Sequence, residues 1–160
     1  MMQDYDYLQE CRKFYEQRLL SKFGPPVGAT EAEVAELRAN LDVNLPIAYH
    51  QFLLWMGKDK HGALKGSEWF IDEVCENGEF LDELLAENEV KRTASNPIVC
   101  FFVHQGYMAA WFSLDDPRSD PLCEFYSEAN SNPIPINVGS FSSFLLKELQ
   151  GVAETSVRIS

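Results

Sequence analysis

IVCFFVHQGYMAAWFSL, residues 98–114, is the stretch of sequence that decides the fold. Two runs rich in aromatic and β-branched residues flank His104-Gln105-Gly106, a short segment that ends in glycine. Runs of this kind around a three-residue turn predict an antiparallel β-hairpin. Because side chains alternate along a strand, Trp111 and Phe112 lie on opposite faces, and we expect one face to meet a helix and the other to border a pocket.

The residues after the hairpin are expected to extend the sheet and to close the fold. A turn-rich segment leads into a short strand at residues 122–126. Residues 134–138 are expected to form an edge strand, because Pro135 has no amide proton for a ladder. Ser140 caps a helix over residues 141–149, and residues 151–160 are expected to be a flexible tail.

The residues before the hairpin predict helices. Apolar positions at helical spacing favour one helix at residues 5–22 and another at residues 45–57. In the second, Pro46 lies in the first turn, where its missing amide proton costs nothing. Gly57 at the other end is expected to adopt a left-handed C-cap conformation.

Two further helices are predicted from local signals. Thr30 and Glu33 have the spacing of a capping box, in which each side chain accepts a hydrogen bond from the other residue's amide. A helix is therefore expected to begin after Thr30. Leucines at helical spacing predict a second helix over at least residues 79–86, and Asn77-Gly78 is expected to break the segment before it.

These elements predict an α+β fold in a single domain, with N-terminal helices, a central antiparallel β-meander and a closing C-terminal helix. A length of 160 residues suits one domain with a core of its own. We divide the chain into a helical extension at residues 1–24, the α+β domain at residues 25–150 and the tail at residues 151–160.

The charge balance limits the classes of partner. The chain carries 13 Lys and Arg residues against 25 Asp and Glu residues, a formal charge of -12. Such a balance repels the phosphates of nucleic acids and the anionic surface of membranes. We expect no nucleic acid and no membrane as a partner, and a basic protein surface instead.

The cysteines and histidines indicate no metal site. Four cysteines are scattered without a C-x-x-C pair, and three histidines show no zinc-ligand spacing. We expect reduced thiols, no cofactor and a cytoplasmic location, since the first residues resemble no signal peptide and no apolar run is long enough to span a membrane.

Several motifs together resemble the SUKH superfamily. Thr30-x-x-Glu33 is followed by Leu45-Pro46-x-x-Tyr49-x-x-Phe52-Leu53 and Gly57, which resembles the opening signature of these domains. Ser140-Phe141-Ser142-Ser143-Phe144-Leu145 resembles their closing helix, and the glycine-bearing hairpin lies between the two. The likeness spans about residues 25–149, and the chain departs from it where Met56 precedes Gly57 in place of the usual asparagine.

The resemblance implies a binding protein without catalysis of its own. The superfamily is named for a fungal regulator of cell-wall synthesis, and most bacterial members look like immunity proteins that neutralise toxins, often nucleases. We therefore expect an immunity protein whose partner is a cognate toxin or another basic protein surface. The alternative is a regulatory scaffold that binds an endogenous protein.

The acidic segment at residues 68–89 is the main candidate binding surface. It holds nine carboxylates and no Lys or Arg, and like charges that repel one another lower stability unless a basic partner relieves them. Trp69 and Phe70 beside it can serve as aromatic anchors or belong to the core. His104 and Tyr107 at the hairpin are further candidates. The expected partner-binding residues are Glu68, Trp69, Asp72, Glu73, Glu76, Glu79, Asp82, Glu83, His104 and Tyr107.

An enzyme is the less favoured interpretation. A cysteine and a histidine, such as Cys100 and His104, could in principle form a nucleophilic pair. Cys100, however, lies in an apolar strand, where a thiol is poorly reactive. The sequence contains no G-x-S-x-G, H-E-x-x-H, Walker or Rossmann motif. No catalytic residue is therefore assigned.

Overall fold

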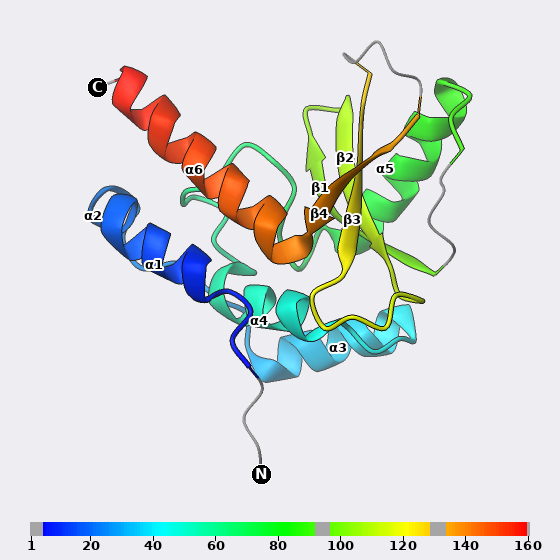
Figure 1. Ribbon diagram of the computed structural model, residues 1–160. Helices are drawn as coiled ribbons and strands as arrows, with labels where there is room; N and C mark the ends of the chain where they lie inside the picture. Colours follow the sequence, from blue (N-terminus) through cyan, green and yellow to red (C-terminus); the bar gives the residue numbers. More distant parts are fainter. Residues whose placement is uncertain (1–4, 92–96, 129–133, 160) are drawn as a thin grey trace.

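An antiparallel sheet forms the centre of the molecule, and helices cover both of its faces (Figure 1). The computed structural model describes residues 5–91, 97–128 and 134–159. Within them the sheet has four strands, which follow one another in chain order as a meander. The strands are β1 (Ile98–His104), β2 (Met108–Ser113), β3 (Leu122–Ser127) and β4 (Ile136–Ser140).

The predicted hairpin is confirmed as β1 and β2, and it contains a β-bulge. Cys100 pairs with Trp111, but the next partners are Phe102 and Ala110, so Phe101 is an extra residue in β1. A bulge of this kind interrupts the alternation of side chains. As a result, Phe101 and Phe102 both belong to the same core cluster.

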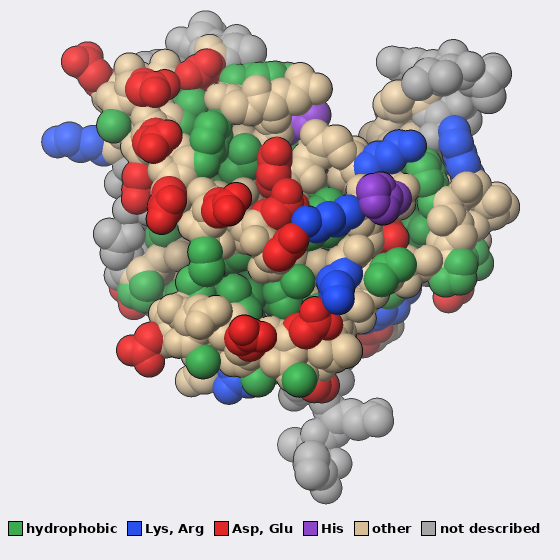
Figure 2. All heavy atoms as spheres, turned by 180° about the vertical axis from the view of Figure 1, so that it is seen from behind, with side chains coloured by type: hydrophobic (Ala, Val, Ile, Leu, Met, Phe, Trp, Pro, Cys, Tyr) green, Lys and Arg blue, Asp and Glu red, His purple; other side chains and the backbone are tan. Residues whose placement is uncertain are grey.

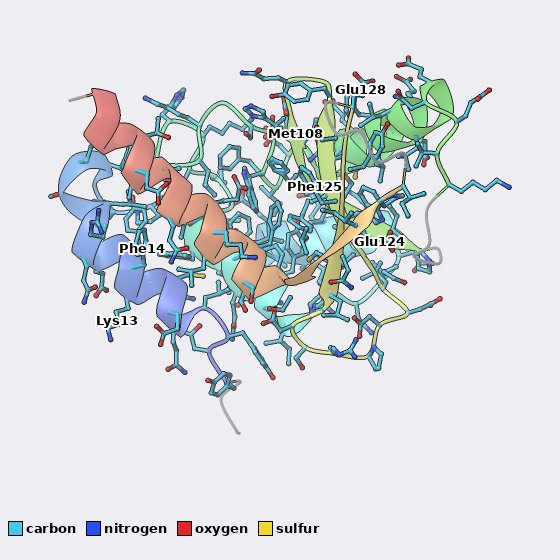
Figure 3. All side chains as sticks on the ribbon, turned by 45° about the horizontal axis from the view of Figure 1, so that its top comes forward. Lys13, Phe14, Met108, Glu124, Phe125 and Glu128 are labelled. Atoms are coloured by element: carbon cyan, nitrogen blue, oxygen red, sulfur yellow. The ribbon has the colours of Figure 1, made fainter. Side chains whose placement is uncertain are left out.

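The second half of the sheet also agrees with the sequence pattern. Cys123 and Phe125 of β3 pack with one core cluster, and Tyr126 packs with the other. Figure 3 shows Glu124 and Phe125 on opposite sides of this strand. β4 pairs only with β3 and is therefore an edge strand.

Five of the described helices precede the sheet in the chain, and the first four are short. These four are α1 (Gln9–Arg18), α2 (Leu20–Phe23), α3 (Glu31–Leu41) and α4 (Ile47–Met56). The predicted capping box starts α3: the Glu33 amide donates to Thr30 Oγ1 at 3.1 Å, and the Thr30 amide donates to Glu33 Oε1 at 3.0 Å. The prediction of a helix start at Thr30 is confirmed.

The ends of α4 agree only in part with expectation. Pro46 directly precedes the first helical residue, but Gly57 is right-handed, with a φ of -62°. The predicted left-handed C-cap is wrong. Glycine is needed here for space, because an added Cβ would lie 2.4 Å from the Leu53 carbonyl oxygen.

Most of the acidic segment forms one unbroken helix, α5 (Val74–Glu87). The predicted break at Asn77-Gly78 is wrong. Asn77 is buried, its amide donates to the Glu73 carbonyl, and its side-chain Nδ2 donates to the Glu68 carbonyl at 3.0 Å. Tertiary hydrogen bonding therefore holds this asparagine inside the helix.

The closing helix, α6 (Phe141–Ile159), is longer than the sequence predicts. Residues 151–159 continue it and do not form a loose tail, because Val152 and Ala153 still pack against the core. α6 lies beside α1, and Cys11 Sγ of α1 lies 3.4 Å from the Ser142 carbonyl oxygen (Figure 1). No helix among the described residues has the length and apolar character needed to cross a bilayer.

The sheet separates two hydrophobic clusters. On one side, an aromatic cluster built around Trp69, Phe101 and Phe141 joins the sheet to α1, α4 and α6, a group we call the helical layer. On the other side, α5 buries Leu81 and Leu84 against β1, β2 and β3. The α+β prediction, with a meander between N-terminal helices and a closing helix, is confirmed.

Candidate functional site

α5 displays its carboxylates on one side because its apolar residues face the other. Val74, Leu81 and Leu84 are spaced by seven and three residues, which places them on one side of the helix, and they are at most 3% exposed. The remaining side of the helix carries acidic side chains in the same repeat. We call the exposed carboxylates of α5 the acidic face: Glu76, Glu79, Asp82, Glu83 and Glu87.

The acidic face gathers negative charge on one part of the surface. Seen from behind, acidic side chains collect at the upper left, over α5, and basic ones are concentrated toward the other half of the molecule (Figure 2). Glu76, Glu79 and Glu83 form no ion pair with any residue that the structure describes. Their spacing of three and four residues makes them neighbours on the helix surface. A local negative potential is the consequence.

The acidic residues that precede α5 are engaged within the protein. Asp72 forms an ion pair with Lys60. Glu73 is half-buried, its Oε1 accepts from the Phe70 amide at 3.3 Å, and burial raises the pKa of its carboxyl. The Glu68 amide donates to the Val103 carbonyl at 2.8 Å, which anchors the segment to β1. Glu68 and Glu73 therefore help to hold the segment against the rest of the protein and contribute less to its exposed surface.

Trp69 and Phe70 are core residues. Trp69 is 1% exposed, and its ring centroid lies 5.2 Å from that of Phe102 and 5.6 Å from those of Phe52 and Phe101. Such a ring has no surface to offer a partner. The prediction of Trp69 as a partner anchor is wrong, and the core alternative holds for both residues.

His104 and Tyr107 lie away from the acidic face. The pairing of Glu68 with Val103 brings Ser67 to His104, where Ser67 Oγ and His104 Nδ1 are 2.6 Å apart. The imidazole stacks on Phe102, on the side of the sheet that faces the helical layer, and Tyr107 packs edge-on against it at 5.9 Å. α5 covers the opposite side, so the ten candidate residues do not form one site.

The thiols offer little chemistry. Cys11, Cys100 and Cys123 are buried, and Cys75 is exposed on α5. Burial raises the pKa of Cys11 to about 12 and also raises that of Cys123, which keeps both thiols protonated near neutral pH. No group of three or more metal-ligating side chains occurs in the described ranges.

No family model matches this chain, and no curated protein matches it. What the chain binds therefore has to be inferred from its own surface.

The sequence reasoning missed a second region, where lysines from distant parts of the chain meet. Lys22 of α2, Lys65 of the loop after α4 and Lys147 of α6 line the same groove, together with His104. The cluster of lysines at residues 58–65 was a signal for Lys65. The other two could not be placed there because their elements are far apart in sequence.

Proposed function

We propose that this protein is a binding domain without catalysis of its own, which docks a basic protein surface on the acidic face of α5. The observation that carries the proposal is the absence of ion pairs at Glu76, Glu79 and Glu83 among the described residues. Exposed like charges at this spacing destabilise a helix slightly. A positively charged partner would remove that repulsion.

The rigidity of α5 supports a docking role. Its apolar side is packed against the sheet, and the hydrogen bond from Asn77 to the Glu68 carbonyl fixes its first turns. The carboxylates are therefore presented on a preformed surface, which lowers the ordering cost of association. Charged surfaces of this kind steer encounter and raise association rates.

For the identity of the partner we follow the SUKH resemblance. The proposed partner is a toxin domain, such as a nuclease whose phosphate-binding surface is basic, and the proposed role is its neutralisation as an immunity protein. The proposed location is the cytoplasm, where reduced thiols such as those of Cys11 and Cys123 are the rule.

The experiment compares association kinetics for two charge-reversed variants and the unmodified protein. The binding partner is a basic toxin domain encoded beside the gene, with its own catalytic residue inactivated. In the test variant, Glu76→Lys, Glu79→Lys and Glu83→Lys are combined. At low salt we expect association slower by a factor of about 10 to 1,000, and a flatter dependence on NaCl concentration.

The matched control combines Glu16→Lys, Glu36→Lys and Glu154→Lys, which are exposed carboxylates on α1, α3 and α6. It changes the net charge by the same amount but leaves the acidic face intact. Equal slowing in both variants would reduce the effect to overall charge. Unchanged kinetics in the test variant would exclude the acidic face as the docking surface.

A further inference from the structure

A groove of about 640 Å³ lies between α6, the end of α2 and the loop that follows α4. We call it the basic groove, after Lys22, Lys65 and Lys147, which line it. Its volume falls in the range of about 300–1,000 Å³ that is typical of small-molecule sites. It borders the helical layer, on the other side of the sheet from α5.

The walls of the basic groove combine apolar and polar groups. The half-buried Phe23 and Val152 supply apolar surface from α2 and α6, and the buried Leu64 and Trp69 lie beneath it. Gly151 adds no side chain to the helix wall, and an added Cβ there would meet no atom within 4 Å. Of the thirteen described lining residues, seven carry a polar or charged side chain and six are apolar or glycine, a mixture that suits a ligand with both an apolar and a charged part.

The three lysines are not neutralised within the described part of the chain. The loop after α4 holds three lysines, of which Lys58 pairs with Glu33 at 3.0 Å and Lys60 pairs with Asp72. Lys65, the one that lines the groove, forms no ion pair with a described residue, and neither does Lys22 or Lys147. In a chain with 25 acidic residues, such convergence of unpaired lysines is notable. A concave surface concentrates the resulting positive potential.

His104 and Glu148 complete the polar lining. The hydrogen bond between Ser67 Oγ and His104 Nδ1 orients the imidazole and leaves its Nε2 for a ligand. Glu148 is the single carboxylate among the described lining residues, and burial raises its pKa. Its negative charge is therefore easier to neutralise than that of an exposed glutamate.

We propose that the basic groove binds a small organic anion, a molecule with an apolar body and a phosphate or carboxylate group. The apolar body lies against Phe23 and Val152, and the anionic group lies among the lysines. This site is separate from the acidic face and does not depend on the proposed docking of a basic protein. Either proposal can fail without the other.

Calorimetric titration with three probes that share a naphthyl ring tests the proposal. The probes are 1-naphthyl phosphate, 1-naphthoate and the neutral 1-naphthylmethanol. We expect one saturable site for at least one of the two anions, with binding at least about tenfold weaker for the alcohol, since a charge-assisted contact contributes about 1.5–3 kcal/mol. The ratio between the two anions identifies the preferred head group. Added NaCl should weaken anion binding and leave binding of the alcohol unchanged.

Two kinds of variant separate charge from shape. Lys65→Gln and Lys147→Gln should each weaken anion binding about threefold to tenfold. Gly151→Leu should abolish binding of all three probes, because its side chain enters the groove, while the helix keeps its stability. Lys13→Gln is the matched control, since Lys13 is exposed on the outer side of α1 (Figure 3).

Three outcomes would overturn the proposal. The first is the absence of saturable binding for both anions at millimolar concentration. The second is equal affinity for the anions and the alcohol. The third is a loss of affinity in Lys13→Gln as large as in Lys65→Gln, which would reduce the effect to net charge.

Discussion

The acidic face and the basic groove lie on opposite sides of the same sheet and carry opposite charge. The acidic face is a run of carboxylates from one helix, whereas the groove collects lysines from α2, α6 and the loop after α4. A formal charge of -12 describes neither region. The comparison teaches that the fold, and not the composition alone, sets the potential that a partner meets.

Trp69→Ala should have the largest effect, because Trp69 links the groove to the core. The ring lines the groove and is 1% exposed among Phe52, Phe101 and Phe102. We expect the free energy of unfolding, measured by urea titration, to fall by about 3–5 kcal/mol. Tyr5→Ala, at a residue that is 65% exposed, should change it by less than about 0.5 kcal/mol. A stable Trp69→Ala protein would return Trp69 to the binding surface.

Neutralising the acidic face should raise the free energy of unfolding, by less than the Trp69→Ala substitution lowers it. Two like-charge pairs lie on α5, Glu76 with Glu79 and Glu79 with Glu83. Each pair costs roughly 0.2–0.5 kcal/mol of repulsion. The combined Glu76→Gln, Glu79→Gln and Glu83→Gln protein should gain about 0.4–1 kcal/mol of stability at low salt, because glutamine and glutamate have similar helix propensity.

The gain should disappear in high salt, which screens exposed charges. Glu16→Gln on α1 is the control, since Glu16 has Lys13 and Arg12 three and four residues before it. It should gain nothing and can lose a few tenths of a kcal/mol. A gain that is independent of salt would mean that the carboxylates of α5 do not repel one another.

Glu148→Gln removes a carboxylate of the basic groove and should have the smallest effect on the free energy of unfolding. Burial raises the pKa of Glu148 in the folded protein, so the folded state holds the proton more tightly than the unfolded chain does. The free energy of unfolding should therefore fall as pH rises from about the normal glutamate pKa of 4.3 through the higher folded value. Removing the group should flatten this part of the profile.

Unfolding measured at a series of pH values checks this expectation against Glu154→Gln, at an exposed position of the same helix. The effect is small because Glu148 is only half-buried and water screens its charge. A profile that steepens in Glu148→Gln would contradict the assigned direction.

Local sequence signals predicted most of the fold. The capping box at Thr30 and Glu33 and the glycine-bearing turn at Gly106 depend on residues that are close in sequence, and both are confirmed. Of the three failures, those at Asn77 and after Gly151 depended on distant contacts. Asn77 remains helical because the Glu68 carbonyl accepts its side-chain amide, and α6 continues beyond Gly151 because Ala153 is buried.

The candidate sites also differ in whether they depend on local sequence or on distant contacts. The acidic face could be predicted because one helix carries it, and the repeat of Glu76, Glu79 and Glu83 is visible in the sequence. The basic groove could not, because Lys22 and Lys147 meet only after α2 and α6 have packed. Trp69 was ambiguous, since a tryptophan beside an acidic run suits a core and a surface equally well.

The bulge in β1 decides on which face of the sheet the last side chains of this strand lie. With simple alternation after Cys100, Val103 would turn toward the helical layer and His104 toward α5. The extra residue inverts that phase, so Val103 packs under α5 and the imidazole reaches the groove. A chain without Phe101 would lose the bulge and keep both side chains on their present sides, because Val103 would then follow Cys100 by two residues. The histidine of the groove is thus specified by the register in which β1 pairs with β2 as much as by its own identity.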